Sequence, residues 1–293
     1  MKRPDRPVAI IGAGTMGHGI AELVARCGFE VRLQDENVEA LGSAKAGIEG
    51  ILDKALARGT VTRDQKEQTL ARIRSVDTVE EAVDGCWVVI EAVPEDPAIK
   101  EPVFRLLDHL APPTALLASN TSAISITLIA SWTEHPDRVV GLHFFNPPAR
   151  MPLVEVVKGL TTSDKAIERA TRFCEQIGKE TIVVVDRPGF ATSRLSAALG
   201  NEAWYMLMEG VASPKEIDKG VKLALGHPMG PFELGDLIGL DVRLSVLRYL
   251  HQTLGDRFRP CPLLVQYVEA GYLGRKTGRG VYVYHNGSAA QDD

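Results

Sequence analysis

The chain has no excess of positive charge and no long apolar run. Its 33 lysines and arginines stand against 38 aspartates and glutamates, which gives a net charge of −5. A chain with this balance has no general basic field to hold nucleic acid or an anionic membrane surface. No apolar stretch approaches the roughly 18 residues that cross a bilayer. We therefore expect neither a nucleic-acid partner nor a membrane partner.

Cysteines are few and scattered. The four are Cys27, Cys86, Cys174 and Cys261, and no two of them form a CxxC pair. This spacing excludes a zinc knuckle and a small disulfide framework, so we expect reduced thiols and no metal. The basic residues at the amino terminus precede an apolar run that is short and lacks a small-residue cleavage pattern, unlike a secretory signal. We predict a cytoplasmic protein.

The length of 293 residues favours two domains. The first two-thirds alternates Val- and Ile-rich runs with helical stretches, which predicts a parallel sheet covered by helices. The predicted strands are residues 8–11, 30–33, 87–93, 115–118, 138–145, 153–157 and 181–185. The alternation stops near Arg187 and Pro188. We therefore predict an α/β domain over residues 1–187, an all-α domain over residues 188–285 and a disordered tail over residues 286–293.

Residues 37–75 have a helical pattern that breaks near Gly59 and Thr60. This segment is longer than a minimal crossover between parallel strands requires. We predict a helical hairpin that extends from the first domain. In the second domain, amphipathic helices with apolar surfaces favour dimerisation.

The first predicted strand runs directly into a GxGxxG loop that opens a helix. The loop consists of Gly12, Ala13, Gly14, Thr15, Met16 and Gly17. In this context, the glycines allow a tight turn and the close approach of a pyrophosphate. About twenty residues later, Asp35 ends the second strand, where a carboxylate binds the ribose hydroxyls, and Glu36 and Asn37 follow it in place of an arginine. The pattern favours NAD over NADP; a plain glycine turn with a solvated aspartate is the alternative.

Polar side chains follow three further strands at the edge where doubly wound sheets bind ligands. They are Glu95, the cluster at residues 119–122, and residues 143–146. His143 is the one histidine of seven at such a strand end, and Glu155 lies on the next strand. A base with an orienting carboxylate suits hydride transfer from an alcohol. The alternative interpretation of His143 is an ordinary core histidine, and that of residues 119–122 is a helix cap. A buried Glu155, by contrast, needs a cationic partner.

Several motifs carry a family resemblance over nearly the whole chain: GAGTMG, IEAVPED, ASNTSAISIT, GLHFFNPP, MPLVEVV, DRPGF, HPMGPFELGDLIGLD and GRKTGRGVYVY. This set resembles the NAD-dependent L-3-hydroxyacyl-CoA dehydrogenase family, especially its stand-alone 3-hydroxybutyryl-CoA dehydrogenases. The pair HFFNP and LVEVV is the most specific part of it. The resemblance implies a Rossmann-type doubly wound sheet followed by an all-α C-terminal domain, NAD as cofactor, a short-chain acyl-CoA substrate, a place in fatty acid metabolism and a homodimer.

The resemblance also assigns roles to residues. It implies that His143 is the catalytic base, Glu155 its partner, and Ser122 the group that binds the hydroxyl or carbonyl oxygen. The implied cofactor contacts are Gly12, Gly14, Gly17, Asp35, Glu95, Lys100, Asn146 and Lys276.

One position departs from the family pattern. Ser193 stands where the family usually has an asparagine that helps to bind the substrate carbonyl. A serine hydroxyl still donates one hydrogen bond, but its shorter reach leaves room for a bridging water or another substrate. Asn201 lies eight residues further along the same helix, about 12 Å away, and is too far to replace it.

In the family, the helical hairpin contacts coenzyme A. Lys54 and Arg58 share one helix face at i and i+4 and could hold a phosphate, although a solvated basic face is equally compatible with the pattern. Two other functions stay open: dehydrogenation of a non-CoA 3-hydroxy compound, such as a sugar acid or carnitine, and NAD binding by a non-catalytic structural protein.

Overall fold

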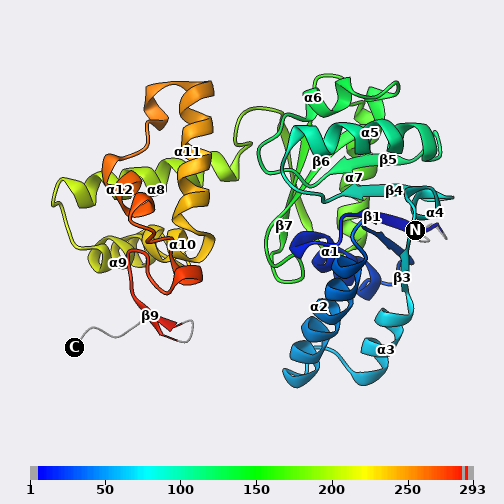
Figure 1. Cartoon of the computed structure of the whole chain (residues 1–293), viewed down its shortest axis with the longest axis horizontal. Coiled ribbons are helices and arrows are strands. Elements are labelled where there is room, and N and C mark those ends of the chain that lie inside the picture. Colours follow the sequence, from blue (N-terminus) through cyan, green and yellow to red (C-terminus); the bar gives the residue numbers. More distant parts are fainter. Residues whose placement is uncertain (1–5, 286–287, 290–293) are drawn as a thin grey trace. The chain divides into compact units, whose positions relative to one another are not determined.

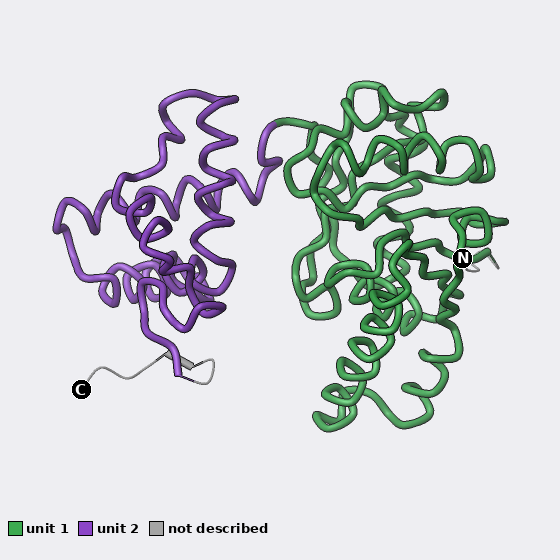
Figure 2. The backbone as a smooth tube through the Cα atoms, in the orientation of Figure 1, with its two compact units in different colours: residues 1–187 green, residues 188–293 purple. Residues whose placement is uncertain are grey.

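The computed structural model describes residues 6–285 and 288–289. The chain divides into two compact units whose boundary falls between Arg187 and Pro188 (Figures 1 and 2). Each unit has a hydrophobic core made of its own residues. Within the described residues, no helix combines the length and apolar character needed to cross a membrane.

The first unit is built on one eight-stranded sheet with the order β3-β2-β1-β4-β5-β6-β7-β8. Its central strands are short and almost wholly apolar because helices cover both faces. The strands are β1 Val8–Ile11, β2 Val31–Gln34, β3 Ile73–Val76, β4 Val88–Glu91, β5 Leu116–Ser119, β6 Val139–Phe144, β7 Leu153–Lys158 and β8 Glu180–Val185. Every residue of β1, β4, β5 and β6 is buried.

Two sequence-based expectations about this sheet are wrong. The segment predicted to be a helical hairpin ends in strand β3. The sequence pattern does not predict this strand, because Arg74 and Ser75 are exposed on an edge strand and leave no apolar run. The sheet is also not wholly parallel, since β6 and β7 are antiparallel. Only eight residues join these two strands, and a parallel connection needs a dozen or more.

Apart from α1, the α-helices of the first unit begin at residues whose side chains cap them. Asn37 caps α2, Thr62 forms a capping box on α3, and Asp96 caps α5. The helices are α1 Thr15–Arg26, α2 Val38–Ala57, α3 Arg63–Ala71, α4 Val79–Val83, α5 Pro97–Leu110, α6 Ile126–Ser131 and α7 Asp164–Gln176. Figure 1 shows α2 and α3 as a hairpin that extends beyond the sheet.

The second unit is mainly helical. Its helices are α8 Thr192–Met208, α9 Pro214–Ala224, α10 Pro231–Ile238, α11 Leu240–Leu254 and α12 Pro262–Glu269. The two-residue strands β9 Tyr284–His285 and β10 Ser288–Ala289 pair beside them. The tail predicted to be disordered therefore includes β10, and the rest of that segment lies outside the described residues.

Buried aspartates explain two glycine-rich motifs of the second unit. Asp236 accepts hydrogen bonds from the backbone N–H groups of Val281 and Tyr282, both at 2.9 Å. A Cβ atom added at Gly280 would lie 2.0 Å from Asp236, and one at Gly230 would lie 2.2 Å from Asp218. Burial raises the pKa of both aspartates above the ordinary range. These glycines therefore serve the packing of the second unit.

Candidate active site

The GxGxxG loop is shaped by close backbone contacts. Gly12 has φ +102°, and a Cβ atom there would lie 2.7 Å from the backbone of Ala92. A Cβ atom at Gly17 would lie 1.8 Å from the carbonyl oxygen of Gly12, so this glycine lets α1 pack against the turn. At Gly14, by contrast, an added Cβ atom would meet no heavy atom of the described residues within 4 Å.

The start of α1 suits an anionic group. Thr15 is the first residue of the helix and Gly14 is its N-cap, which has no side chain to accept hydrogen bonds from the first backbone N–H groups. Such N–H groups, together with the positive end of the helix dipole, bind phosphates. The open space at Gly14 therefore fits the pyrophosphate of a dinucleotide.

Asp35 follows β2 and is half-buried beside the glycine loop. Its Oδ2 accepts a hydrogen bond from the N–H of Ala13 at 2.7 Å, and its Oδ1 accepts one from the N–H of Asn37 at 2.9 Å. An ionised carboxylate has about four acceptor positions, so two backbone bonds leave capacity for ribose hydroxyls. The structure thus brings Asp35 to the loop, as the spacing predicted.

Glu95 holds the loop after β5. One of its oxygens, Oε1, accepts hydrogen bonds from the Thr121 hydroxyl at 2.5 Å, the Ser122 N–H at 2.8 Å and the Ala123 N–H at 3.0 Å. The Ser122 side chain is exposed at this edge of the sheet. The predicted residues Glu95 and Ser122 therefore lie together, although they follow different strands.

Lys100, an implied cofactor contact, belongs to a buried cluster with Glu91, which the sequence analysis did not identify. Its Nζ lies 2.5 Å from Oε1 of Glu91 and 3.4 Å from Oε2 of Glu95. The Ser119 hydroxyl donates to the other oxygen of Glu91 at 2.6 Å. Burial raises the pKa of Glu91, and the Lys100 ammonium opposes this rise. A glutamate inside the apolar strand β4 was a usable signal, because a buried carboxylate needs a partner.

His143 and Glu155 form a cross-strand pair. They are register partners on the antiparallel strands β6 and β7. The Nδ1 atom of His143 lies 2.7 Å from Oε2 of Glu155, and both side chains are buried, at 5% and 0% exposure. A carboxylate at Nδ1 orients the ring and stabilises its protonated form. This is the geometry of a general base with its orienting group.

The turn after β6 adds Asn146 to the same edge. Asn146 is exposed and precedes a cis peptide bond to Pro147. Nearby, Oδ1 of Asn120 accepts a hydrogen bond from the N–H of Phe144 at 3.0 Å, which ties the end of β5 to the end of β6. Asn120 thus supports the strand that carries His143.

The remaining predicted residues belong to other elements of the chain. Lys54 and Arg58 are exposed at the C-terminal end of α2. Ser193 lies in the first turn of α8, in the second unit. Lys276 also belongs to the second unit, where its Nζ lies 2.6 Å from Oδ1 of Asp241. Asn201 bonds the backbone of Arg259 and Cys261, which is a structural role.

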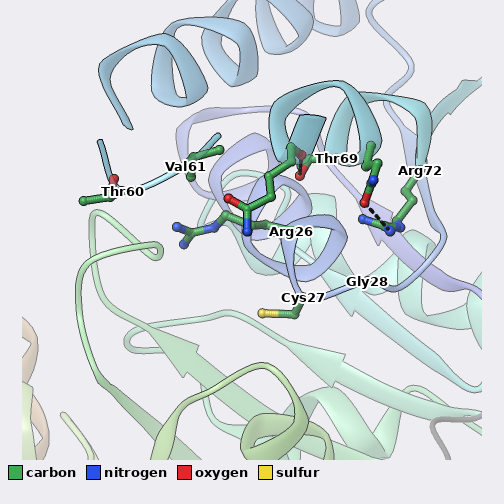
Figure 3. Close-up of a pocket in the computed structure, with 9 residues that line it drawn as sticks. Arg26, Cys27, Gly28, Thr60, Val61, Thr69 and Arg72 are labelled. Carbon is green, nitrogen blue, oxygen red and sulfur yellow. Dashed lines mark hydrogen bonds between the residues drawn. The ribbon is translucent and has the colours of Figure 1, made fainter. Parts of the chain in front are cut away.

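A cavity of about 450 Å³ lies between the end of α1 and α3. Figure 3 shows Arg26 and Arg72 on either side of Thr69 in its lining. None of the predicted site residues lines this cavity. Gly28, which does line it, precedes β2, so the cavity lies at the amino ends of the strands, whereas the glycine loop lies at their carboxyl ends. Among the described residues, no cluster of His, Cys, Asp and Glu side chains is placed to hold a metal ion.

The first unit thus has the architecture of a Rossmann-type oxidoreductase, in which a dinucleotide lies across the carboxyl ends of the parallel strands. Residues 7–187 match the NAD binding domain of 3-hydroxyacyl-CoA dehydrogenase, and residues 189–284 match the C-terminal domain. The chain belongs to the 3-hydroxyacyl-CoA dehydrogenase family, and NAD is its cofactor. The resemblance drawn from the motifs and the predicted fold class are confirmed.

Individual relatives agree with this assignment. A 3-hydroxybutyryl-CoA dehydrogenase from Bradyrhizobium diazoefficiens is 44% identical over 280 residues, with 95% of each chain covered. A probable 3-hydroxybutyryl-CoA dehydrogenase from Bacillus subtilis is 46% identical and covers 95% of this chain and 97% of its own. The solved structure of an (S)-3-hydroxybutyryl-CoA dehydrogenase from Ralstonia eutropha has a TM-score of 0.92 at 42% identity, with 96% and 99% covered.

Proposed function

We propose that this enzyme interconverts a short-chain L-3-hydroxyacyl-CoA and the corresponding 3-ketoacyl-CoA, with His143 as general base. The observation that carries the proposal is the buried pair of His143 and Glu155 at the end of β6, 2.7 Å apart. The names of the most similar curated relatives support the short-chain substrate. NAD, when bound, takes up the hydride that leaves C3 of the hydroxyacyl group.

The protein residues handle the proton and the oxygen. Because Nδ1 of His143 is bonded to Glu155, we assign proton removal from the substrate hydroxyl to Nε2. Glu155 stabilises the imidazolium that results. The Ser122 hydroxyl holds the substrate oxygen, and its position is set by the bonds of Glu95 to the loop after β5.

The cofactor and the acyl carrier need separate sites. We assign the pyrophosphate of NAD to the backbone at residues 12–17, the adenosine ribose to Asp35, and further contacts to Glu95 and Asn146. Lys100 supports this site through its ion pairs with Glu91 and Glu95. We assign a phosphate of coenzyme A to Lys54 and Arg58, because both side chains are exposed on the hairpin.

We also propose a homodimer formed through the second unit. Several large apolar side chains there are exposed in the single chain, and exposed apolar side chains that lie together mark protein–protein interfaces. They include Leu195 at 72%, Val211 at 60%, Leu223 at 76% and Leu225 at 61%. Light scattering on the purified protein should give twice the mass of one chain; a monomer at micromolar concentration would contradict this assignment.

The catalytic proposal is tested by following NADH oxidation with acetoacetyl-CoA. We expect His143→Gln to lower kcat by about 100-fold or more, within the range that general bases contribute, and circular dichroism shows whether the variant is folded. Full activity of this variant would overturn the role of His143. His109→Gln, a change on the outer end of α5, serves as the matched control.

A non-CoA substrate is the second candidate, and two observations favour testing it. By the family resemblance, Ser193 stands where an asparagine is usual. A solved structure with 33% identity and a TM-score of 0.78 is a 5-dehydrogenase of a pyridine carboxylic acid, described as an NAD+-dependent dismutase. A panel of hydroxyacyl-CoA thioesters and free hydroxy acids distinguishes the two. If coenzyme A is recognised, Lys54→Glu combined with Arg58→Glu should raise KM for the thioester and leave the KM for NADH unchanged.

A further inference from the structure

Lys179 is a buried cation that the proposed reaction does not use. It lies just before β8 and is 7% exposed. Its Nζ donates hydrogen bonds to the carbonyl oxygens of Pro148 and Met151, at 2.6 and 2.7 Å. An ammonium group is costly to bury, and burial together with Arg26 lowers the pKa of Lys179. A buried charge on two loop carbonyls therefore calls for an explanation.

Both carbonyls belong to the turn that joins β6 to β7. This turn follows His143 and Phe144, precedes β7 with Glu155, and carries Asn146. Three of its residues are prolines, at 147, 148 and 152, which have no backbone N–H to donate. The turn thus has few donors for bonds of its own, and Lys179 supplies two from outside it.

The same turn also touches α1, the helix of the glycine loop. A Cβ atom added at Gly19 would lie 3.1 Å from the Pro148 ring, so helix and turn are in close contact. Glu22, one turn further along α1, is 1% exposed, and its charge attracts Lys179. Glu22 pairs with Arg26 at 3.1 Å through Oε1, while Oε2 has no hydrogen-bond partner among the described residues. Lys179 therefore binds a turn that packs directly against α1.

We infer that Lys179 is a positioning residue for the cofactor site. It holds the β6–β7 turn against α1 and so fixes the distance between Asn146 and the glycine loop, the two sides of the NAD site. This inference rests on the proposed function for the role of Asn146. An error of about 1 Å in such a separation is enough to cost up to 100-fold in rate.

The test measures NADH binding, which requires no substrate. Lys179→Met keeps much of the side chain's length and removes all donors. We expect the Kd for NADH, followed by NADH fluorescence, to rise about 10-fold, which corresponds to the loss of about 1.4 kcal/mol of binding free energy. Lys165→Met, an exposed lysine on α7, is the matched control and should bind NADH as the unaltered enzyme does. An unchanged Kd in Lys179→Met would overturn the inference.

A double-variant comparison separates positioning from general destabilisation. If Lys179 acts through Asn146, then Lys179→Met added to Asn146→Ala should weaken NADH binding no further than Asn146→Ala alone. Additive losses would contradict the inference. If Lys179→Met fails to fold, Glu22→Gln takes its place. This variant removes the negative charge of Glu22 from α1 and should also raise the Kd for NADH. An unchanged Kd for NADH would contradict the inference. NADH binding that responds in this way without turnover of any hydroxyacyl-CoA would refute the proposed function and leave the role of Lys179 intact.

Discussion

At the scale of single residues, buried carboxylates and their partners decide what the site can do. Glu155 meets His143 and Glu91 meets Lys100, and both glutamates have no exposed surface. An isolated carboxylate in such a place would be protonated or destabilising. Glu155 is paired with a histidine rather than with a lysine, and an imidazole is the side chain that most often serves as a general base.

We predict that Glu155→Gln lowers kcat about 100-fold while NADH still binds. A glutamine amide does not stabilise the imidazolium, and its NH₂ group favours the wrong tautomer of His143. Steady-state kinetics with acetoacetyl-CoA check this, with Glu175→Gln on the exposed face of α7 as control. A kcat within twofold of the unaltered enzyme would remove Glu155 from the mechanism.

Ser193 offers a second prediction at this scale. Ser193→Asn restores the amide that the family usually has at this position, and one added hydrogen bond to the substrate carbonyl is worth about 1 kcal/mol. We expect kcat/KM for acetoacetyl-CoA to rise about fivefold, in line with that energy. A decrease with the thioester, accompanied by retained activity on a free hydroxy acid, would instead favour the non-CoA substrate.

At the scale of elements, the residues of the proposed site lie at the carboxyl ends of the strands, and the glycine loop leaves space for the cofactor. Gly14 and Gly17 have different roles here. A Cβ atom at Gly14 meets no described heavy atom within 4 Å, whereas one at Gly17 lies 1.8 Å from the Gly12 carbonyl oxygen. A side chain at Gly14 would therefore obstruct a bound ligand, whereas a side chain at Gly17 would obstruct the packing of α1 against the turn.

This difference predicts two distinct phenotypes. Gly14→Ala should keep the melting temperature and weaken NADH binding, because the added methyl group occupies the space assigned to the pyrophosphate. Gly17→Ala should lower the melting temperature, because helix α1 must shift. Gly50→Ala in α2, where a Cβ atom is also unobstructed within the described part of the chain, is the control for both. Equal NADH binding by Gly14→Ala and the control would place the pyrophosphate elsewhere.

A buried ion pair connects α5 to the start of β6. Arg138 lies 2.8 Å from Oδ1 of Asp108, and Arg138 with its neighbours lowers the pKa of that carboxyl although burial opposes the change. The stabilisation is present above the ordinary aspartate pKa and is lost as pH falls through the lowered value. Asp108→Asn should therefore cost about 3 kcal/mol in the free energy of unfolding at pH 7. Urea unfolding should show this difference shrinking below about pH 4; a constant difference would contradict it.

Elements also show where prediction from the sequence stops. Strands with apolar runs, such as β1 and β4, were predicted because burial on both faces leaves a readable pattern. Strand β3 was not, since an exposed edge strand has no such requirement. The antiparallel β6–β7 pair follows from its short connection, a constraint that hydrophobic periodicity does not contain.

At the scale of the whole molecule, the two units have separate cores. The core of the first unit contains residues up to Ile177, and that of the second begins at Ala197. Each unit also has its own buried polar clusters, such as Glu91 with Lys100 in the first and Asp236 with Tyr284 in the second.

We predict that a fragment ending at Arg187 folds cooperatively and binds NADH but does not turn over acetoacetyl-CoA. It keeps the complete sheet, Asp35, and the pair of His143 with Glu155, and it lacks Ser193 and Lys276. Thermal unfolding and NADH fluorescence check the two parts of the expectation. A fragment without a cooperative transition would show that the first unit depends on the second.

The sequence by itself determined the glycine loop with Asp35 and the family, and it predicted a division near Arg187 and the roles proposed for His143 and Glu155. These are local patterns or short-range motifs, in which chemistry and spacing along the chain suffice. Only the tertiary structure decided that Glu91 pairs with Lys100, that Glu95 holds the loop of Ser122, and that Lys179 binds the β6–β7 turn. Those contacts depend on strand order and register, which are set by packing between segments far apart in the chain.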